Sequence, residues 1–245
     1  MKNYWVDKMK TDEKLLIDGK RLDGRLPEQL REITMKVGVV SRANGSAEVS
    51  FGKTTAIASV HGPRALFPRF LQESSTGILR TRYNMAPFSV NDRKSPGPDR
   101  RSTEISKVIR LALAPAVLLE DFPKATIDGF VEIIQADGST RVTGINALSL
   151  AMAAAGVPMI DLVASCSVGK IEDTLILDLN GKEDNNSAAD LAFAMLPNKE
   201  VITLLQMDGA LSKGEILKLL QVAKGACKEI YELQKKTLKD SYKGE

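Results

Sequence analysis

The stretch IIQADGSTRVTGINALSLAMAAAG, residues 133–156, joins an apolar strand to a helix rich in small residues through the loop DGSTR. Such a loop can simply cap the helix, because Ser, Thr and Asp side chains accept hydrogen bonds from the free N–H groups of the first turn. It can also hold a phosphate, since a helix N-terminus offers free N–H groups and a partial positive charge. Arg141 would add planar donors beside the Ser139 and Thr140 hydroxyls. By itself this loop favours capping over phosphate binding.

Strands and helices are predicted on the N-terminal side of this loop. Asn44-Gly45 indicates a hairpin between the first two of four strands, so this part should form a β meander. A helix is expected over residues 101–120, kinked or divided at Pro115, and a strand over residues 126–135. The four strands are predicted near residues 33–40, 47–51, 55–60 and 79–88.

The C-terminal part repeats the arrangement of strands followed by a helix. Ser212 and Glu215 form a capping box, so a long helix is predicted to begin at Ser212. Its buried stripe is expected to comprise Ile216, Leu219, Leu220, Ala223, Cys227, Ile230 and Leu233. The strands before it are predicted near residues 162–168, 174–179, 191–196 and 201–206. Two halves of about four strands plus a helix predict a pseudo-duplicated α+β fold.

The composition is typical of a globular protein, with 43% hydrophobic and 27% charged residues. No composition break marks a linker, so residues 1–245 are predicted to form a single domain. Within it, residues 1–18 are expected to be a loosely held N-terminal arm, and KRLDGR, residues 20–25, a charged and turn-rich segment. The net charge of +3 is too small for nucleic-acid binding by overall excess, so a basic site requires local clustering.

Several patterns exclude other classes of protein. Cys166 and Cys227 lie far apart without neighbouring His or Cys, which argues against a zinc site and a disulfide framework. GKTT, residues 52–55, is not a P-loop, because that motif needs glycine where Ala47 stands. His61 lacks an accompanying nucleophile motif and is interpreted as structural. We see no signal-peptide core or bilayer-length apolar run, and therefore expect a cytoplasmic protein without membrane contact.

Cationic residues gather before the helix predicted over residues 101–120. Arg100 and Arg101 end the Pro/Gly-rich segment SVNDRKSPGPDRR and enter the helix N-terminus. The helix dipole disfavours cations at that end, so the pair is expected to favour an anion. A solvated loop paired with its neighbouring carboxylates explains the same residues equally well.

Two further pairs of arginines lie upstream. Arg64 and Arg69 alternate with aromatic residues in GPRALFPRF, a composition that suits stacking on single-stranded bases. Arg80 and Arg82 should point to one face of a strand, because side chains alternate along it. An ordinary polar strand face accounts for the second pair about as well.

Acidic residues gather in LDLNGKEDNNSAADLAFAML, residues 177–196. Glu183, Asp184 and Asp190 lie in and just beyond a predicted hairpin loop, where such residues usually serve solubility. Asp190, however, opens an apolar strand. Two converging carboxylates would bind a divalent ion or raise one another's pKa, so acid or metal chemistry is an alternative.

Taken in chain order, the motifs KRLDGR, RYNMAPFS, DRRSTEISKVIR, IIQADGSTR and EDNNSAADLAFA resemble the signature set of the RNase PH family of phosphorolytic exoribonucleases. The resemblance covers about residues 16–231. Within the family, the short chain and the DRR-containing loop are most similar to the catalytic subunit of archaeal exosome rings. The resemblance implies a ribosomal-protein-S5-domain-2-like fold and a hexameric ring, a trimer of dimers with a related non-catalytic subunit and RNA-binding cap proteins.

The same resemblance implies an activity. Inorganic phosphate would remove nucleotides from the 3′ end of single-stranded RNA as nucleoside diphosphates, and the reverse reaction would add 3′ tails. Because phosphate is itself the nucleophile, the protein mainly has to hold two repelling anions in line. The roles implied by motif match are inorganic-phosphate binding by Gly138, Ser139, Thr140 and Arg141, RNA-phosphate binding by Arg100 and Arg101, a place near the central pore for Arg64 and Arg69, and catalysis by Asp184 and Asp190, with Mg²⁺ expected at these two aspartates.

One position departs from the family pattern. The loop usually has a second glycine where this chain has Ser139, and if that glycine adopts a positive φ, Ser139 imposes modest strain. Two other functions stay open: a homohexameric RNase PH that trims tRNA 3′ ends, and a non-catalytic RNA-binding ring subunit. Asp184, Asp190 and Arg141 argue against the second of these, because threading RNA needs positive charge but no carboxylates.

Overall fold

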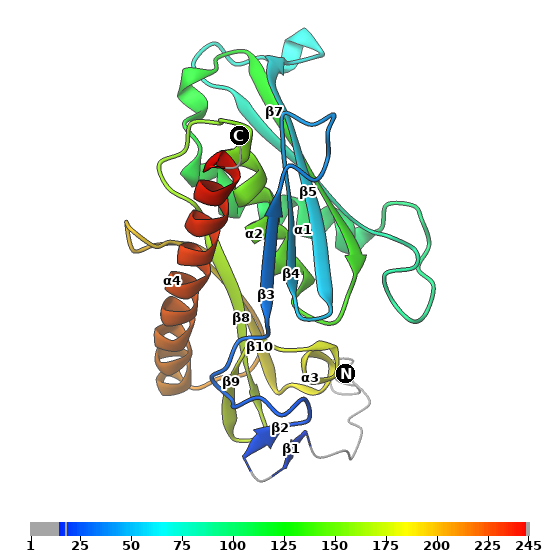
Figure 1. Ribbon diagram of the computed structural model, residues 1–245, viewed down its shortest axis with the longest axis vertical. Helices are drawn as coiled ribbons and strands as arrows, with labels where there is room; N and C mark the ends of the chain where they lie inside the picture. Colours follow the sequence, from blue (N-terminus) through cyan, green and yellow to red (C-terminus); the bar gives the residue numbers. More distant parts are fainter. Residues whose placement is uncertain (1–14, 18, 244–245) are drawn as a thin grey trace, which may run out of the picture.

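Two large β-sheets and the helices packed on them make up the computed structural model, which describes residues 15–17 and 19–243 (Figure 1). The five-stranded sheet has the order β3 (Ile33–Val37), β4 (Gly45–Phe51), β5 (Thr54–Ala65), β7 (Ala125–Gln135) and β6 (Ile78–Met85). The four-stranded sheet has the order β11 (Val201–Gly209), β10 (Ala189–Leu196), β8 (Ala164–Ile171) and β9 (Thr174–Leu177). The α-helices are α1 (Arg100–Leu113), α2 (Thr140–Ala154), α3 (Gly181–Asn186) and α4 (Lys213–Lys243), and 3₁₀ turns cover Arg69–Leu71, Ala114–Ala116 and Leu119–Asp121.

The first three strands of the large sheet form the predicted meander, but the fourth does not continue it. β7 lies between β5 and β6, and β6 runs parallel to β7 with Arg80 opposite Asp128. Parallel neighbours require a crossover, and α1 lies within it. The meander prediction is therefore wrong for residues 79–88, since strand propensity does not specify the neighbouring strand. The predicted division at Pro115 is confirmed, because α1 gives way there to a 3₁₀ turn.

The hairpin between β3 and β4 forms as Asn44-Gly45 indicated, but Gly45 serves a different purpose. The residue with a left-handed backbone in this loop is Gly38, with φ +79°. A Cβ at Gly45 would lie 2.2 Å from the backbone N of Ala155. Glycine is therefore needed at position 45 for the close approach of the strand to the end of α2.

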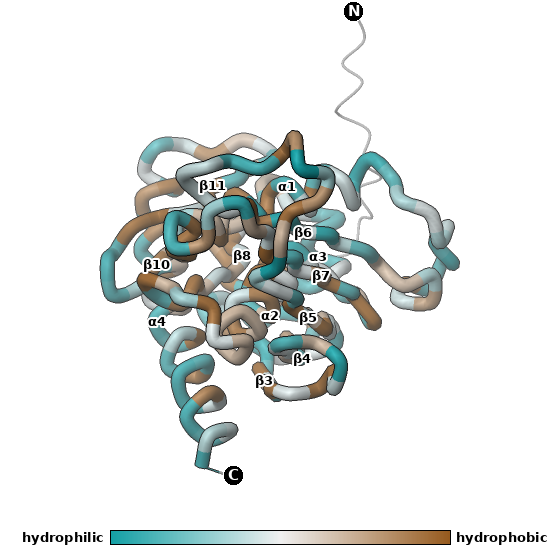
Figure 2. The backbone as a smooth tube through the Cα atoms, turned by 90° about the horizontal axis from the view of Figure 1, so that it is seen from above, coloured by the Kyte–Doolittle hydropathy of each residue, from teal (hydrophilic) through white to brown (hydrophobic). Residues whose placement is uncertain are grey.

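The small sheet and its long helix match the predicted elements with two exceptions. β8 pairs with both β9 and β10, so β9 and β10 do not form the predicted hairpin, and α3 occupies the connection between them. The capping box of α4 is present, with Ser212 N donating to Glu215 Oε2 at 2.7 Å. Leu233 is 38% exposed and Gln234 is buried in its place, because a 3.6-residue repeat drifts around a long helix. Figure 2 shows the alternation of hydrophilic and hydrophobic residues along α4.

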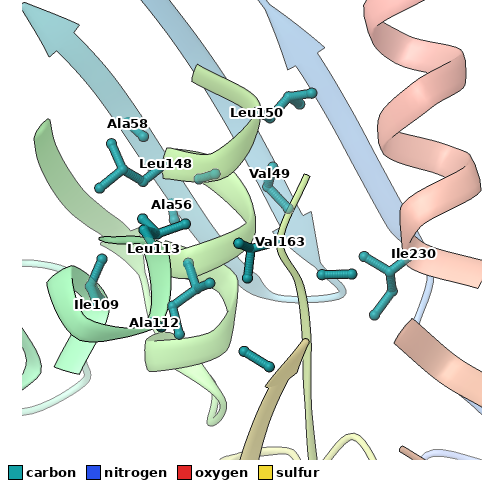
Figure 3. Packing of buried hydrophobic residues seen from close by; sticks show 14 of the residues in the cluster. Val49, Ala56, Ala58, Ile109, Ala112, Leu113, Leu148, Leu150, Val163 and Ile230 are labelled. Carbon is teal, nitrogen blue, oxygen red and sulfur yellow. The ribbon is translucent and has the colours of Figure 1, made fainter. Parts of the chain in front are cut away.

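The core forms around α2, which contacts strands of both sheets and is buried along most of its length. Figure 3 shows Leu148 and Leu150 of α2 among residues from β4, β5, α1 and α4. One contiguous cluster of buried apolar residues therefore joins the two halves. The halves contain five and four strands, and the prediction that they make a single domain stays a prediction. Among the described residues, no helix is long and apolar enough to span a bilayer.

The N-terminal segment is more ordered than predicted where the structure describes it. β1 (Leu16–Ile17) pairs with β2 (Lys20–Arg21), so KRLDGR begins inside a regular element. Leu15 is 4% exposed and packs with Ile171, Ile176 and Leu179 of the second half. Residues 15–17 are therefore not a loose arm, and the remainder of the predicted arm, residues 1–14 and 18, lies outside the described residues.

The two cysteines meet in the core although they lie far apart in the sequence. Cys166 of β8 and Cys227 of α4 are buried free thiols with their Sγ atoms 3.7 Å apart. The adjacent Cys227 thiol and burial raise the pKa of Cys166, which disfavours the reactive thiolate. They are free thiols, in agreement with the argument against a disulfide framework, and they are neighbours in the fold although not in the sequence. His61 packs edge-on against Phe130 with ring centroids 5.8 Å apart, consistent with a structural imidazole.

Candidate active site

A cavity of about 550 Å³ lies where the DGSTR loop, the N-terminus of α1 and α3 meet. Arg101, the loop residues Gly138, Ser139 and Thr140, and Asp184 all line it. A smaller adjoining cavity of about 40 Å³ is lined by Arg101, Ser139, Thr140, Arg141, Asp184 and Asp190. Three segments that are far apart in the sequence thus bring arginines and carboxylates to one place.

The DGSTR loop does not cap α2 in the simple way that its composition suggests. Ser139 has φ 57° and ψ 22°, a left-handed conformation, and its side chain makes no capping bond within the described structure. Its Oγ instead donates to the carbonyl of Leu179 at 2.7 Å and lies 2.6 Å from Ser167 Oγ. The capping interpretation of Ser139 is therefore wrong, and the positive φ that we considered for this position is present.

Thr140 also has a partner other than the helix backbone. The Tyr83 hydroxyl donates to Thr140 Oγ1 at 2.9 Å. Burial raises the pKa of Tyr83, so its hydroxyl stays protonated and available as a donor. The Ser139 hydroxyl donates to the Leu179 carbonyl, whereas Thr140 Oγ1 accepts from Tyr83 and keeps its own O–H as a donor. The Thr140 hydroxyl, the backbone N–H groups and Arg141 are therefore the groups of this loop that are suited to an anion.

Arg141 carries an unsatisfied donor. Its Nε is buried and has no hydrogen-bond partner among the described residues. A buried donor without a partner is costly, and a guanidinium bonds most strongly to carboxylate or phosphate oxygens. Since Arg141 lines the small cavity beside Thr140, its guanidinium is suited to binding an anion there.

The N-terminus of α1 presents one of its two arginines to the site. Arg101 lines both cavities, whereas Arg100 is exposed and lies outside both sets of lining residues. Asp99 caps the helix by accepting from Ser102 N at 2.6 Å, and Lys94 Nζ lies 2.9 Å from Asp99 Oδ2. The hydrogen bonds from Lys94 and Ser102 hold the pKa of Asp99 well below its usual range. Asp99 is therefore a charged cap that orders the segment carrying Arg101.

The three acidic residues of the second half separate into two roles. Asp184 on α3 and Asp190 at the start of β10 both line the small cavity. Glu183 is 2% exposed and accepts from Arg21 Nε at 2.7 Å. Asn180 caps α3, and its side chain accepts from Glu183 N at 3.0 Å. The short helix thus directs Asp184 and Glu183 to different surroundings, which spacing alone did not predict.

The other predicted arginines lie away from this site. Arg64, Arg80 and Arg82 line a separate cavity of about 200 Å³ that also contains Asp128. Asp128 is buried and accepts from Arg64 Nε at 3.0 Å and from Arg80 Nε at 2.6 Å. Its burial alone would raise its pKa, but the hydrogen bonds from Arg80 and Arg64 outweigh this and lower the pKa. Arg80 and Arg82 line the same cavity, as expected for side chains on one face of a strand.

The segment between β5 and β6, which contains the 3₁₀ turn Arg69–Leu71, lies at the top of Figure 1, whereas α3 lies near the bottom. The neighbours of Arg69, Phe67 and Phe70, are 79% and 84% exposed. These exposed aromatic rings beside an exposed arginine have the composition expected of a surface for single-stranded bases.

Some residues of the large cavity were not predicted from the sequence. Met85, Lys94 and Asn185 line it in addition to the expected residues. Each lies inside or beside one of the quoted motifs, so proximity to these motifs is the signal that would have identified them. Arg31, which donates to the Asp137 carbonyl of the DGSTR loop, and its buried partner Asp178 were also missed, because nothing local marks a buried ion pair.

Comparison with known proteins finds matches over most of the chain. Residues 29–158 match the domain described as "3′ exoribonuclease family, domain 1", and residues 161–226 match domain 2 of the same family. The chain is 57% identical over 229 residues to the exosome complex component Rrp41 of Pyrococcus furiosus, covering 93% of this chain and 92% of that protein. It is 49% identical over 227 residues to Rrp41 of Nitrosopumilus maritimus, with 93% of each chain covered.

Two solved structures share the fold. Rice (Oryza sativa) Rrp46 has a TM-score of 0.80 at 23% identity, covering 89% of this chain and 100% of that one. A chain of the Archaeoglobus fulgidus exosome with RNA bound to the active site has a TM-score of 0.78 at 19% identity, covering 88% and 92%. At these identities the likeness concerns the fold.

Proposed function

The chain belongs to the 3′ exoribonuclease (RNase PH) family, and we propose that it shortens single-stranded RNA from the 3′ end by phosphorolysis as the catalytic subunit of an exosome ring. The resemblance predicted from its motifs is thereby confirmed, as is the RNase PH-like fold. The relatives that are about half identical to it are named exosome components, which favours an exosome subunit over a self-sufficient tRNA-trimming enzyme.

The observation that carries this proposal is the small cavity, where the unsatisfied Nε of Arg141 lies with Asp184 and Asp190. The guanidinium and the N-terminus of α2 would hold inorganic phosphate, and Arg101 would hold the phosphodiester that is attacked. Positive groups from two helices would thus bring two anions together, the main requirement of a reaction in which phosphate is the nucleophile.

In the proposed reaction, an oxygen of inorganic phosphate attacks the phosphorus of the last phosphodiester. A new P–O bond forms, the bond from phosphorus to the 3′ oxygen of the preceding nucleotide breaks, and a nucleoside diphosphate leaves. The departing 3′ oxygen takes up a proton, which Asp184 would help to deliver. Water is not consumed, so the reaction is phosphorolysis and not hydrolysis, and its reversal would add 3′ tails.

The donor set fits Mg²⁺ as a cofactor. Asp184 and Asp190 offer hard carboxylate oxygens, whereas the described residues contain no cluster of three or more His, Cys, Asp or Glu side chains suited to a metal. Mg²⁺ commonly binds through one or two carboxylates together with substrate phosphates and water. When bound, it would neutralise charge on the transferred phosphoryl group.

The partners are part of the same proposal. We assign a related non-catalytic subunit to a trimer-of-dimers ring with this chain, RNA-binding cap proteins above the ring, and a cytoplasmic location. Arg64, Arg69, Arg80 and Arg82 would guide the RNA toward the site, because arginine side chains attract its phosphates. Arg64, Arg80 and Arg82 line one separate cavity, and Arg69 lies in the 3₁₀ turn between β5 and β6. Contacts of this kind are to phosphates, so sequence preference should be weak.

The test is an incubation of the purified chain, alone and with the related ring subunit, with a 3′-tailed RNA, Mg²⁺ and either phosphate or none. Phosphate-dependent release of nucleoside diphosphates is expected. A requirement for the second subunit would support the exosome assignment, and full activity of the chain alone would favour the homohexameric enzyme. Nucleoside monophosphates released without phosphate would contradict phosphorolysis, and RNA binding without any product would favour a non-catalytic subunit.

A further inference from the structure

A buried ion pair outside the cavity joins the two halves of the fold. Arg31, just before β3, donates through Nε to Asp178 Oδ2 at 2.9 Å and through Nη2 to Asp178 Oδ1 at 2.7 Å. The side chains are 6% and 1% exposed. Arg31 N also donates to Asp178 Oδ2 at 2.8 Å, so the carboxylate is held in a planar, two-pronged arrangement that lysine cannot reproduce.

The third nitrogen of this guanidinium, Nη1, bonds to the DGSTR loop. Arg31 Nη1 donates to the carbonyl of Asp137, the first residue of the loop, at 2.7 Å. Thr54 supports the same turn, because its Oγ1 accepts from Asp137 N at 2.9 Å and donates to the carbonyl of Gly138 at 2.8 Å. The loop is therefore anchored from the first half by three hydrogen bonds to its backbone.

The carboxylate of the pair lies on the segment that leads into α3. Asp178 has a left-handed φ of 56° and is followed by Leu179, the α3 cap Asn180, and α3 itself. Its carbonyl accepts from Arg21 Nη2 at 2.7 Å. Because Arg21 also pairs with Glu183 on α3, the segment and the helix are held together.

The loop and the α3 segment are in direct contact at two glycines. A Cβ at Gly138 would lie 2.6 Å from the carbonyl carbon of Asn180, and one at Gly181 would lie 2.8 Å from Asp137 Oδ1. Gly181 N donates to Asp137 Oδ1 at 3.0 Å. Because the backbones are in close contact at Gly138 and the Asp137 side chain bonds to the first residue of α3, a shift of the loop is transmitted to α3, which carries Asp184.

We propose that Arg31 and Asp178 are positioning residues that set the separation between the phosphate held by the DGSTR loop and the carboxylate of Asp184. The inference rests on the proposed function and assigns no contact with substrate to either residue. Stability alone is a weak reason for such a pair, because the desolvation of two buried charges largely offsets their attraction. The geometry gives a stronger reason for the pair, since one guanidinium donates both to the DGSTR loop and to Asp178 in the segment before α3.

The primary variant is Arg31→Lys, which keeps the charge but cannot bond to both Asp178 oxygens and the Asp137 carbonyl. Because a misplacement of about 1 Å can cost roughly 100-fold in rate, we expect a 10- to 100-fold loss of kcat/KM for phosphate. Both a raised KM for phosphate and a lowered kcat should contribute. The KM for RNA should change by less than about threefold, because the phosphate contacts of RNA come from other residues.

A second variant and a matched control keep the test decisive. Thr54→Val removes the hydroxyl that anchors the loop but leaves the ion pair, and should raise the KM for phosphate in the same direction by a smaller factor. Ile230→Ala truncates a buried side chain of α4 and should lower the thermal midpoint while leaving the KM for phosphate unchanged. All three are assayed in the assembled ring below their midpoints.

A readout independent of turnover is the rise in thermal midpoint caused by added inorganic phosphate, which reports phosphate binding. Wild type and Ile230→Ala should be stabilised equally, and Arg31→Lys clearly less. The positioning role is overturned if Arg31→Lys retains the phosphate KM, kcat and phosphate-induced shift of the control. Wild-type protein that neither responds to phosphate nor releases diphosphates would instead overturn the proposed function, so the two failures are distinguishable.

Discussion

Replacing Ser139 by alanine should destabilise the chain by about 2 kcal/mol, and replacing it by glycine should cost less, about 1 kcal/mol. The serine hydroxyl bonds to the Leu179 carbonyl at 2.7 Å and to Ser167 Oγ at 2.6 Å. A buried hydrogen bond contributes on the order of 1 kcal/mol net, so either replacement loses about 2 kcal/mol from these bonds.

The two variants differ in the backbone term. Position 139 has a φ of 57°, which costs an L-residue about 1–2 kcal/mol but costs glycine little. Glycine therefore avoids most of this backbone cost, but it also makes the unfolded chain more flexible, which lowers the stability by about 0.4–1 kcal/mol. The glycine variant should therefore be more stable than the alanine variant by about 0.5–1 kcal/mol. Serine tolerates the strained position because its hydroxyl is tied to the segment before α3.

The assay is urea denaturation followed by far-UV circular dichroism at one fixed protein concentration, because ring assembly adds to apparent stability. The expected order of unfolding free energy is wild type, Ser139→Gly, Ser139→Ala. A difference of 2 kcal/mol in a chain of this length corresponds to roughly 4–8 °C in thermal midpoint, which is readily measured. An alanine variant as stable as wild type, or more stable than the glycine variant, would refute the reasoning about hydrogen bonds and strain.

Four further predictions concern the site and its surroundings. Asp184→Asn should reduce phosphate-dependent turnover about 10²- to 10⁴-fold with little change in RNA affinity, and an equal loss of both in a binding assay would contradict its assigned role. Arg141→Lys should raise the KM for phosphate about tenfold, because one ammonium replaces a planar donor set; an unchanged KM would argue against an anion at Arg141. Gly138→Ala should destabilise the chain by at least about 2 kcal/mol, since φ is +74° and the added Cβ would lie 2.6 Å from the carbonyl carbon of Asn180; a wild-type denaturation midpoint would contradict this. The pKa of Asp128 is lowered from 3.8 in the folded chain, so its stabilisation is present above about pH 3.8 and is lost as the pH falls through the lowered value. The stability difference between wild type and Asp128→Asn should accordingly stay constant from pH 6 to about pH 4 and shrink as the pH falls below about 3.8 in denaturation experiments. A difference that stays constant below that pH would show that the charge contributes nothing.

Local signals predicted most elements and several site residues. The capping box at Ser212, the break at Pro115 and the strand that begins near Asp190 all depend on residues within a few positions of one another. Such signals act through backbone conformation and short-range hydrogen bonds, so the sequence carries them directly. The same holds for the DGSTR loop, whose position before α2 was correctly identified.

Other features could not be predicted because they depend on which distant segments meet. β7 lies between β5 and β6, and α3 lies where a hairpin was expected. Local propensities do not distinguish these arrangements from other strand pairings. The roles of the carboxylates at Glu183 and Asp184 separate only because Arg21 reaches one of them. KRLDGR was interpreted as a charged and turn-rich segment, and nothing local shows that Arg21 will be buried against the second half.

By itself, therefore, the sequence determined the order of the main strands and helices, the family and the residue types that carry the chemistry. Only the tertiary structure decided how they meet: Arg101, Arg141, Asp184 and Asp190 around one cavity, and the Ser139 hydroxyl bonded away from its own helix. The physical reason is the separation along the chain of the residues that interact. Helix caps and turns are stabilised by neighbouring residues, whereas a site assembled from three segments exists only when the packing of both sheets on α2 brings those segments together.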